Sequence, residues 1–148
     1  MSADPVTQSS VDLRPWRTFK APSLAEFEAL AREEFEKLPE HFLSVCGELV
    51  IRVDDFATKD VLKSMQIGDP FELMGLFQGT GLPFRSQGVS GEMPNMIWLY
   101  RRPILDYWAE NDETLGHVIT HVLIHEIGHH FGLSDADMEA LEAQVAEA

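Results

Sequence analysis

The chain has 148 residues, 45% of them hydrophobic, so it is long enough to fold as one domain around a core of its own. Its formal net charge of −14 argues against nucleic acid and anionic membranes as partners, because phosphate binding needs clustered Lys and Arg. The single cysteine, Cys46, rules out an intramolecular disulfide, and with no apolar run of membrane-spanning length and no signal-like start we expect a cytoplasmic protein.

Residues 1–22 are polar and carry three prolines, which predicts a poorly ordered tail before a single domain over residues 23–148. Ser23 and Glu26 have the spacing of a capping box, so a first helix is predicted to begin there and to end at Pro39. The inward stripe of this helix is formed by apolar residues at helical spacing, namely Leu24, Phe27, Ala31, Phe35 and Leu38.

The middle of the chain predicts a small sheet. An ambiguous connection at residues 42–46 is followed by segments rich in apolar and β-branched residues. Strands are predicted at residues 49–53, 73–78 and 96–101, with a short helix at 58–66.

The segment at residues 79–95 is rich in Gly, Pro and Ser. Loops of this length are uncommon in compact domains and are often binding rims or lids, so we expect it to influence substrate choice. Beyond the third strand, Pro103 is expected to close the strand, residues 104–108 to form a helical turn, and Asp112 to cap a long helix. Because helices and strands do not alternate strictly, the predicted fold class is α+β.

The most specific feature is the run from His125 to Asp135, which reads His-Glu-x-x-His-x-x-Gly-x-x-Asp. On a helix, His125 and His129 lie on one face, one turn apart, so their imidazoles can bind one zinc ion. Glu126 points to one side, where it can accept a proton from a zinc-bound water without being a ligand. Gly132 can take the left-handed conformation that ends a helix and turns the chain back, which offers Asp135 as a third ligand.

The motif residues also have structural readings. The motif helix is apolar around most of its circumference, so it is predicted to be buried, and its histidines could be satisfied core residues. Ser134 and Asp135 equally fit the N-cap and first turn of a last helix over residues 136–147, with a water in the place of the third ligand.

Three further histidines flank the motif. His121 lies about 40° from His125 around the helix, where it could orient a ligand or respond to pH, although a satisfied rim histidine is the commoner case. His117 continues the same four-residue spacing, and His130 projects away from the ligand face and is read as structural or as a hydrogen-bonding neighbour. No motif identifies an oxyanion partner; the candidates, each with a structural or surface alternative, are Tyr100, Arg101 and Arg85.

Taken with three upstream segments, the motif resembles that of the bacterial minimal zincin-like metallopeptidases, which have a matrix-metalloprotease-like minimal domain. The matching segments are Leu38-Pro39, Gly75-Leu76-Phe77-Gln78-Gly79 and Leu99-Tyr100-Arg101-Arg102-Pro103-Ile104. The resemblance implies a minimal zincin-like fold, with a small three-stranded mixed sheet packed against the motif helix, a Zn²⁺ cofactor and a peptide or protein substrate. Metzincins add a Met-turn beneath the metal, but Met138 lies within the predicted last helix, so a separate Met-turn is not expected.

The sequence therefore predicts a zinc metallopeptidase that hydrolyses peptide bonds with a metal-activated water. His125, His129 and Asp135 are the predicted metal ligands and Glu126 is the predicted general base. A family of small metal-dependent ribonucleases has histidines at the same offsets, but it lacks the glutamate, and this acidic chain offers little for RNA. The stronger alternative is a non-catalytic metal-binding or adaptor module that retains the motif.

Overall fold

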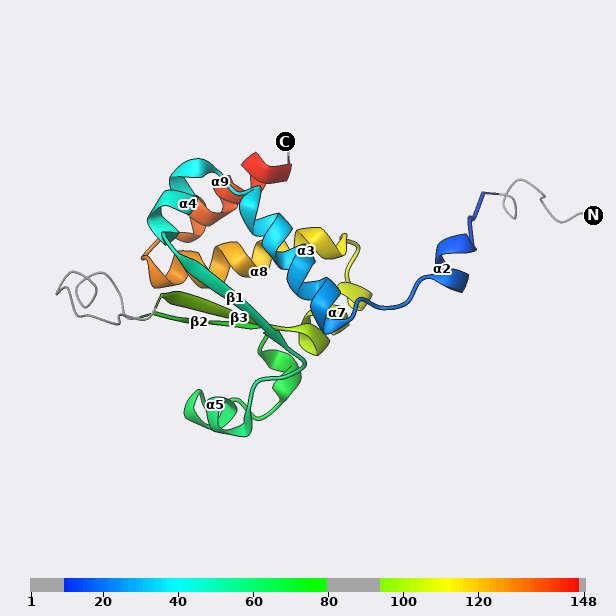
Figure 1. Ribbon diagram of the computed structural model, residues 1–148, viewed down its shortest axis with the longest axis horizontal. Coiled ribbons are helices and arrows are strands. Elements are labelled where there is room, and N and C mark those ends of the chain that lie inside the picture. The colour runs from blue at the N-terminus through cyan, green and yellow to red at the C-terminus, as the bar shows by residue number, and fades with distance from the viewer. Residues whose placement is uncertain (1–9, 80–93, 147–148) are drawn as a thin grey trace, which may run out of the picture.

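The computed structural model of the chain describes residues 10–79 and 94–146 and shows a small sheet with helices packed on it (Figure 1). The elements before the second strand are α2 (Arg14–Thr18), α3 (Leu24–Glu36), α4 (Glu40–Cys46), β1 (Leu49–Asp54), α5 (Lys59–Ser64) and the 3₁₀ helix η1 (Pro70–Glu72). They are followed by β2 (Gly75–Gln78), β3 (Asn95–Tyr100), α7 (Arg101–Glu110), α8 (Leu115–His130) and α9 (Asp135–Ala146). This arrangement confirms the α+β class.

The sheet has three strands in the order β1-β3-β2. The central strand β3 runs parallel to β1, with Ile97 opposite Ile51, and antiparallel to β2, with Ile97 opposite Phe77. The mixed three-stranded sheet expected from the resemblance is therefore confirmed. In the described part of the chain β2 pairs only with β3, so it forms an edge of the sheet.

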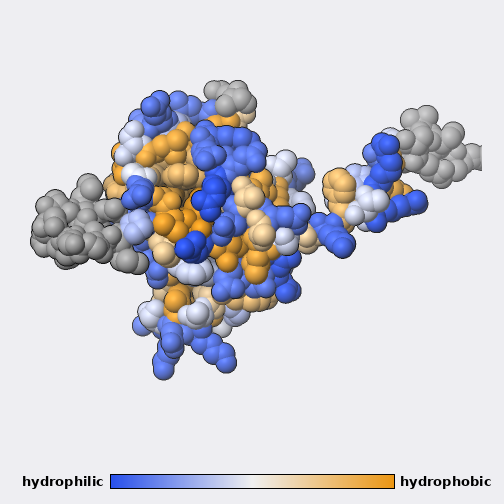
Figure 2. Space-filling model, in the orientation of Figure 1, coloured by the Kyte–Doolittle hydropathy of each residue, from blue (hydrophilic) through white to orange (hydrophobic). Residues whose placement is uncertain are grey.

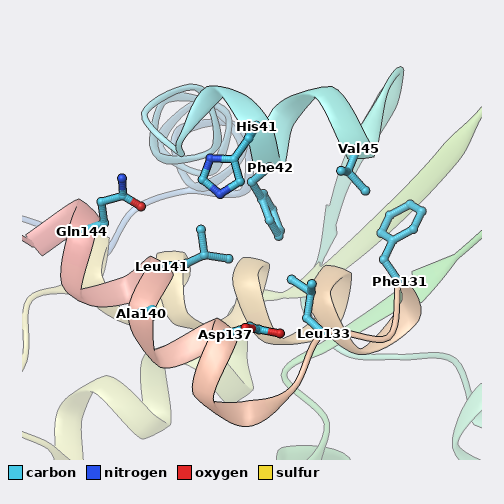
Figure 3. A pocket seen from close by; sticks show the side chains of 9 residues that line it. All are labelled: His41, Phe42, Val45, Phe131, Leu133, Asp137, Ala140, Leu141 and Gln144. Carbon is cyan, nitrogen blue, oxygen red and sulfur yellow. The ribbon is translucent and has the colours of Figure 1, made fainter.

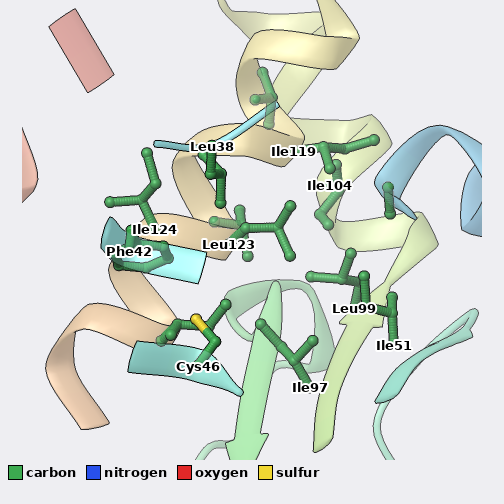
Figure 4. Packing of buried hydrophobic residues seen from close by; sticks show 14 of the residues in the cluster. Leu38, Phe42, Cys46, Ile51, Ile97, Leu99, Ile104, Ile119, Leu123 and Ile124 are labelled. Atoms are coloured by element: carbon green, nitrogen blue, oxygen red, sulfur yellow. The ribbon is translucent and has the colours of Figure 1, made fainter. Parts of the chain in front are cut away.

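Side chains of β3 alternate between two apolar clusters, as the period of a strand requires. Ile97 and Leu99 are fully buried in the main core, together with Ile119 and Leu123 of α8 (Figure 4). Tyr100 belongs to a smaller cluster on the side of α5. The motif helix α8 thus packs against the sheet through the main core.

The first long helix begins where predicted, but it ends at Glu36, and Leu24 of the expected inward stripe is exposed because it lies in the first turn, away from the core. The hydroxyl of Ser23 accepts a hydrogen bond from the backbone N–H of Glu26, and the Glu26 carboxylate accepts one from the N–H of Ser23. This reciprocal capping box opens α3, which buries Phe27 and Ala31 one turn apart.

Residues 40–46 form a helix where only a connection was expected. Pro39 precedes the first turn of α4, and Phe42 and Cys46, four residues apart, are both buried. Because residues four apart share one helix face, this apolar pair is enough to attach a short helix to the core.

The segment after the sheet differs from the prediction in two details. The strand β3 ends at Tyr100, and the chain enters α7 directly at Arg101. Pro103 therefore lies inside the helix and does not close the strand; it is tolerated because a proline in the first helical turn has no intrahelical N–H bond to lose. The long helix α8 is capped by Thr114 and not by Asp112: the Thr114 hydroxyl accepts a hydrogen bond of 3.1 Å from the N–H of His117.

The helix α2 was not predicted, and it buries none of its residues. It stands apart from the body in Figures 1 and 2, with Trp16 and Phe19 73% and 77% exposed. None of the helices in the described ranges has the length and apolar character needed to cross a membrane.

Candidate metal centre

Three histidines form one stripe along α8. The ring centroids of His121 and His125 lie 4.1 Å apart, and those of His125 and His129 lie 5.9 Å apart. His125, in the middle of the stripe, is 23% exposed, and His121 and His129 on either side of it are 40% and 59% exposed. The predicted placement of His125 and His129 on one helix face is thereby confirmed.

Glu126 lies beside this stripe, in a hollow of about 190 Å³ between α8 and the start of β2. Removal from water raises the pKa of the Glu126 carboxyl, and the nearby His129 and His125 only partly oppose this effect. A carboxylate with a raised pKa is a better proton acceptor near neutral pH, which is the property that a general base needs.

Gly75, the first residue of β2, fixes how the sheet approaches Glu126. A Cβ at this position would lie 2.8 Å from Cγ1 of Val122 and 3.3 Å from Cγ of Glu126. The strand can lie this close to α8 only because Gly75 has no side chain. The edge of the sheet therefore borders the side chain of Glu126 directly.

The turn after the motif helix forms as predicted. Gly132 has a φ of +77°, and the chain then enters α9. The hydroxyl of Ser134 accepts a hydrogen bond from the N–H of Asp137, whose carboxylate accepts one from the N–H of Ser134, so Ser134 caps the last helix.

Asp135 is the first residue of α9, and its side chain is 89% exposed. Its Oδ1 lies 4.0 Å from Nε2 of His129. The carboxylate is near the motif histidines, and its role as a ligand stays a prediction.

Glu142 on α9, which was not among the residues predicted from the sequence, also reaches the histidine stripe. Its Oε1 lies 2.6 Å from Nδ1 of His121 and its Oε2 lies 3.1 Å from Nε2 of His125. Within residues 10–79 and 94–146, these three residues form the group of His, Cys, Asp and Glu whose ligand atoms lie within 4.8 Å of one another.

The charge on Glu142 depends on the two histidines. Burial alone would raise the pKa of its carboxyl, but the hydrogen bonds and charges of His121 and His125 outweigh burial and lower it. The signal for this residue was present in the sequence, because Met138 and Leu141 mark the inward face of α9 and Glu142 follows four residues after Met138.

The remaining histidines near the motif have other contacts. The ring of His130 packs on Phe77 with centroids 4.2 Å apart, which supports the structural reading. His117 pairs with Glu113 of the preceding segment, with 3.0 Å between Nδ1 and Oε1.

The two oxyanion candidates within the described residues, Tyr100 and Arg101, do not gather at the histidines. Tyr100 is buried and lines a separate hollow with Trp98, and burial raises the pKa of its hydroxyl. Arg101 pairs with Asp55 at 2.9 Å and donates from Nε to the carbonyl of Pro22, which are structural contacts. Arg85, and residues 80–93 of the proposed substrate-selecting loop, lie outside the described residues.

A larger apolar hollow of about 370 Å³ lies between α4 and α9 (Figure 3). Its walls include Phe42 and Val45 from α4 and Leu141 from α9, and Phe131 and Leu133 from the turn between α8 and α9. None of the stripe histidines lines it. It is therefore distinct from the hollow at Glu126.

The donor types on this side of the molecule fit zinc, which takes imidazole nitrogens and carboxylate oxygens. A family model described as zincin-like metallopeptidase matches residues 46–145, which include β1 to β3, the motif helix and most of α9. A search of curated proteins found no match. The match covers well over half of the sequence, so the chain belongs to the zincin-like metallopeptidase family.

Proposed function

We propose that the protein is a zinc-dependent peptidase in which His125 and His129 hold the metal, a carboxylate predicted to be that of Asp135 completes the protein ligands, and Glu126 is the general base. The observation that carries the proposal is the position of Glu126, a partly buried carboxylate with a raised pKa, between the histidine stripe and the edge of the sheet. The family match supports the same class of activity.

Zinc bound at the two imidazoles would polarise the scissile carbonyl and lower the pKa of its water to about 7. Glu126 would accept the proton of the attacking water and later deliver it to the leaving amine. Its partial burial supports the first step, because a carboxyl group with a raised pKa accepts a proton more readily.

The edge strand β2 is the proposed binding place for the substrate chain. Its first residue, Gly75, borders Glu126, and the strand pairs only with β3 in the described part of the sheet. An extended peptide could therefore add to β2 through backbone hydrogen bonds and place a peptide bond near the base. The substrate class is accordingly a peptide or an extended segment of a protein.

Two broader proposals accompany this function. The domain is taken to span residues 23–148 after a tail at 1–22, in keeping with the absence of buried residues in α2. A cytoplasmic location is supported by the one buried cysteine, Cys46, which suits a reducing compartment.

A non-catalytic metal-binding module remains the second candidate. It is favoured by one observation: the exposed carboxylate of Asp135 is 4.0 Å from His129, so the predicted ligands are not gathered as a closed set. A structural zinc site should cause a large loss of stability when the metal is removed by a chelator, whereas a catalytic site should not.

The test is cleavage of a denatured protein or a peptide library by the zinc-loaded protein. Glu126→Gln should lower the cleavage rate by about 10²–10⁴-fold, the usual contribution of a general base. Glu139→Gln, at an exposed position of α9, is the matched control and should retain full activity. Cleavage that survives Glu126→Gln would refute the assigned base, and zinc binding without any cleavage would favour the module.

A further inference from the structure

The carboxylate best placed to join a metal at His125 is that of Glu142 and not that of Asp135. Glu142 is only 16% exposed and has one oxygen 3.1 Å from Nε2 of His125. Asp135 is 89% exposed and lies 4.0 Å from the more exposed His129. A ligand held in place before the metal arrives loses less conformational freedom on binding it.

The contacts of Glu142 with His121 and His125 differ in length, and this difference distinguishes an oxygen that can bind the metal from one that is held by a hydrogen bond. Two ligand atoms at about 2.0–2.1 Å from one zinc in tetrahedral geometry lie about 3.3 Å apart. The 3.1 Å hydrogen-bond distance between Oε2 and Nε2 of His125 is also close to that spacing, whereas the 2.6 Å between Oε1 and Nδ1 of His121 is too short for it and is that of a short hydrogen bond. One oxygen is thus placed to ligate, while the other is held by His121.

The packing of α9 on α8 keeps Glu142 at this position. A Cβ on Gly128 would lie 2.6 Å from Sδ and 3.0 Å from Cγ of Met138, so the two helices approach closely where Gly128 has no side chain. Met138 is fully buried. Glu142 lies one turn further along α9 on the same face, which brings it over the histidines one to two turns back along α8.

We propose that Oε2 of Glu142, in place of Asp135, is the carboxylate ligand of the zinc bound at His125, and that His121 positions this carboxylate through Oε1. The inference rests on the proposed function, because it takes the metal to be bound at His125. Glu142 is then a ligand, whereas His121 acts through Glu142 and is a positioning residue.

The experiment measures zinc affinity by competition with a chromogenic chelator, together with the absorption spectrum of the Co²⁺-loaded protein. Glu142→Gln should weaken zinc binding by more than about 100-fold and change the Co²⁺ spectrum, because residues that only orient a ligand cost about 10–100-fold. His121→Asn should fall within that lower range and keep the spectrum. Asp135→Asn and the control Glu139→Gln should bind zinc like the wild type.

A second variant distinguishes the loss of a metal ligand from misfolding. Glu142→Asp keeps the carboxylate, and its zinc affinity should lie between those of the wild type and Glu142→Gln at an unchanged circular dichroism spectrum. If zinc affinity falls in Asp135→Asn and is kept in Glu142→Gln, the inference is overturned while the proposed function stands. If zinc affinity falls in Glu142→Gln and is kept in His129→Ala, Glu142 is supported as a ligand. The proposed function then fails in its choice of His129 as a metal ligand. A wild-type protein that binds no zinc overturns both.

Discussion

The two faces of α8 have opposite characters although they belong to one helix. On one face Ile119, Leu123 and Ile127 are completely buried against the sheet and α3. On the other face, the stripe of His121, His125 and His129 is partly exposed, and its first two histidines contact Glu142 of α9. Burial of apolar surface is the main source of stability, whereas the polar stripe requires partners when it is buried. The core face therefore fixes the helix in the fold, and the histidine face is left for the proposed metal site.

The largest expected effect tests whether the core face carries stability alone. Leu123→Ala removes a fully buried side chain and should lower the free energy of unfolding by about 2–5 kcal/mol, measured by urea denaturation. Zinc affinity below the unfolding transition should be unchanged. The exposed variant His117→Asn on the same helix is the matched control and should change stability by less than about 0.5 kcal/mol. A loss of zinc binding in Leu123→Ala would show that the two faces are not independent.

A smaller effect is expected where the two faces are linked through α9. Gly128→Ala places a methyl group against the buried Met138 and should cost about 1–3 kcal/mol of stability. It should also weaken zinc binding, because α9 carries Glu142. At Gly116 of the same helix a Cβ would meet no atom closer than 3.4 Å, so Gly116→Ala should instead gain up to about 1 kcal/mol. Equal effects of the two substitutions would contradict the close approach of α8 and α9.

A still smaller effect concerns the stability of the metal-free protein. Burial raises the pKa of Glu126 in the folded state, so the folded protein binds this proton more tightly than the unfolded chain does. Stability is then lost as the pH rises from the unfolded pKa to the folded pKa, and the whole loss is present above the folded value. Glu126→Gln should therefore be more stable than the wild type at pH 7 in a chelator.

The difference should vanish at acid pH, below the ordinary carboxyl pKa of 4.5, where Glu126 is protonated in both states. Urea denaturation at pH 4 and pH 7 measures both values. A wild type that is the more stable at pH 7 would mean that the Glu126 carboxylate is stabilised by its surroundings, against the assigned burial effect.

The smallest expected effect concerns the rate at which a thiol reagent labels Cys46 in the core. Cys46 is 2% exposed, and burial raises the pKa of its thiol to about 11, so little thiolate is present at pH 8. Labelling by a thiol reagent should be slow in the folded protein and should accelerate as urea unfolds it. Rapid labelling in the absence of urea would show that the α4 side of the core opens readily.

The sequence predicted the parts of the fold that depend on local patterns. The Ser23–Glu26 capping box and the apolar spacing of α3 are local, and so is the left-handed turn at Gly132. The helix α4 was missed because seven residues give too short a period, and its apolar pair gains stability only from contacts made elsewhere. Asp112 was expected as a cap because the sequence does not show which of several polar residues takes the extended conformation at Thr114.

The candidate site divides in the same way. The relative placement of His125, Glu126 and His129 could be predicted, because their spacing on one helix sets their directions. Glu142 was not found, since its contact with His121 and His125 depends on how α9 packs across α8. Periodicity marks the inward face of α9, but it does not show what that face meets.

The central claim, that the histidine face of α8 binds one zinc ion, is tested most directly by calorimetric titration of the metal-free protein with zinc. We expect one zinc per chain for the wild type and no measurable binding for His125→Ala at an unchanged circular dichroism spectrum. Equal zinc binding by His125→Ala and the wild type would contradict it, and so would a wild type that binds none.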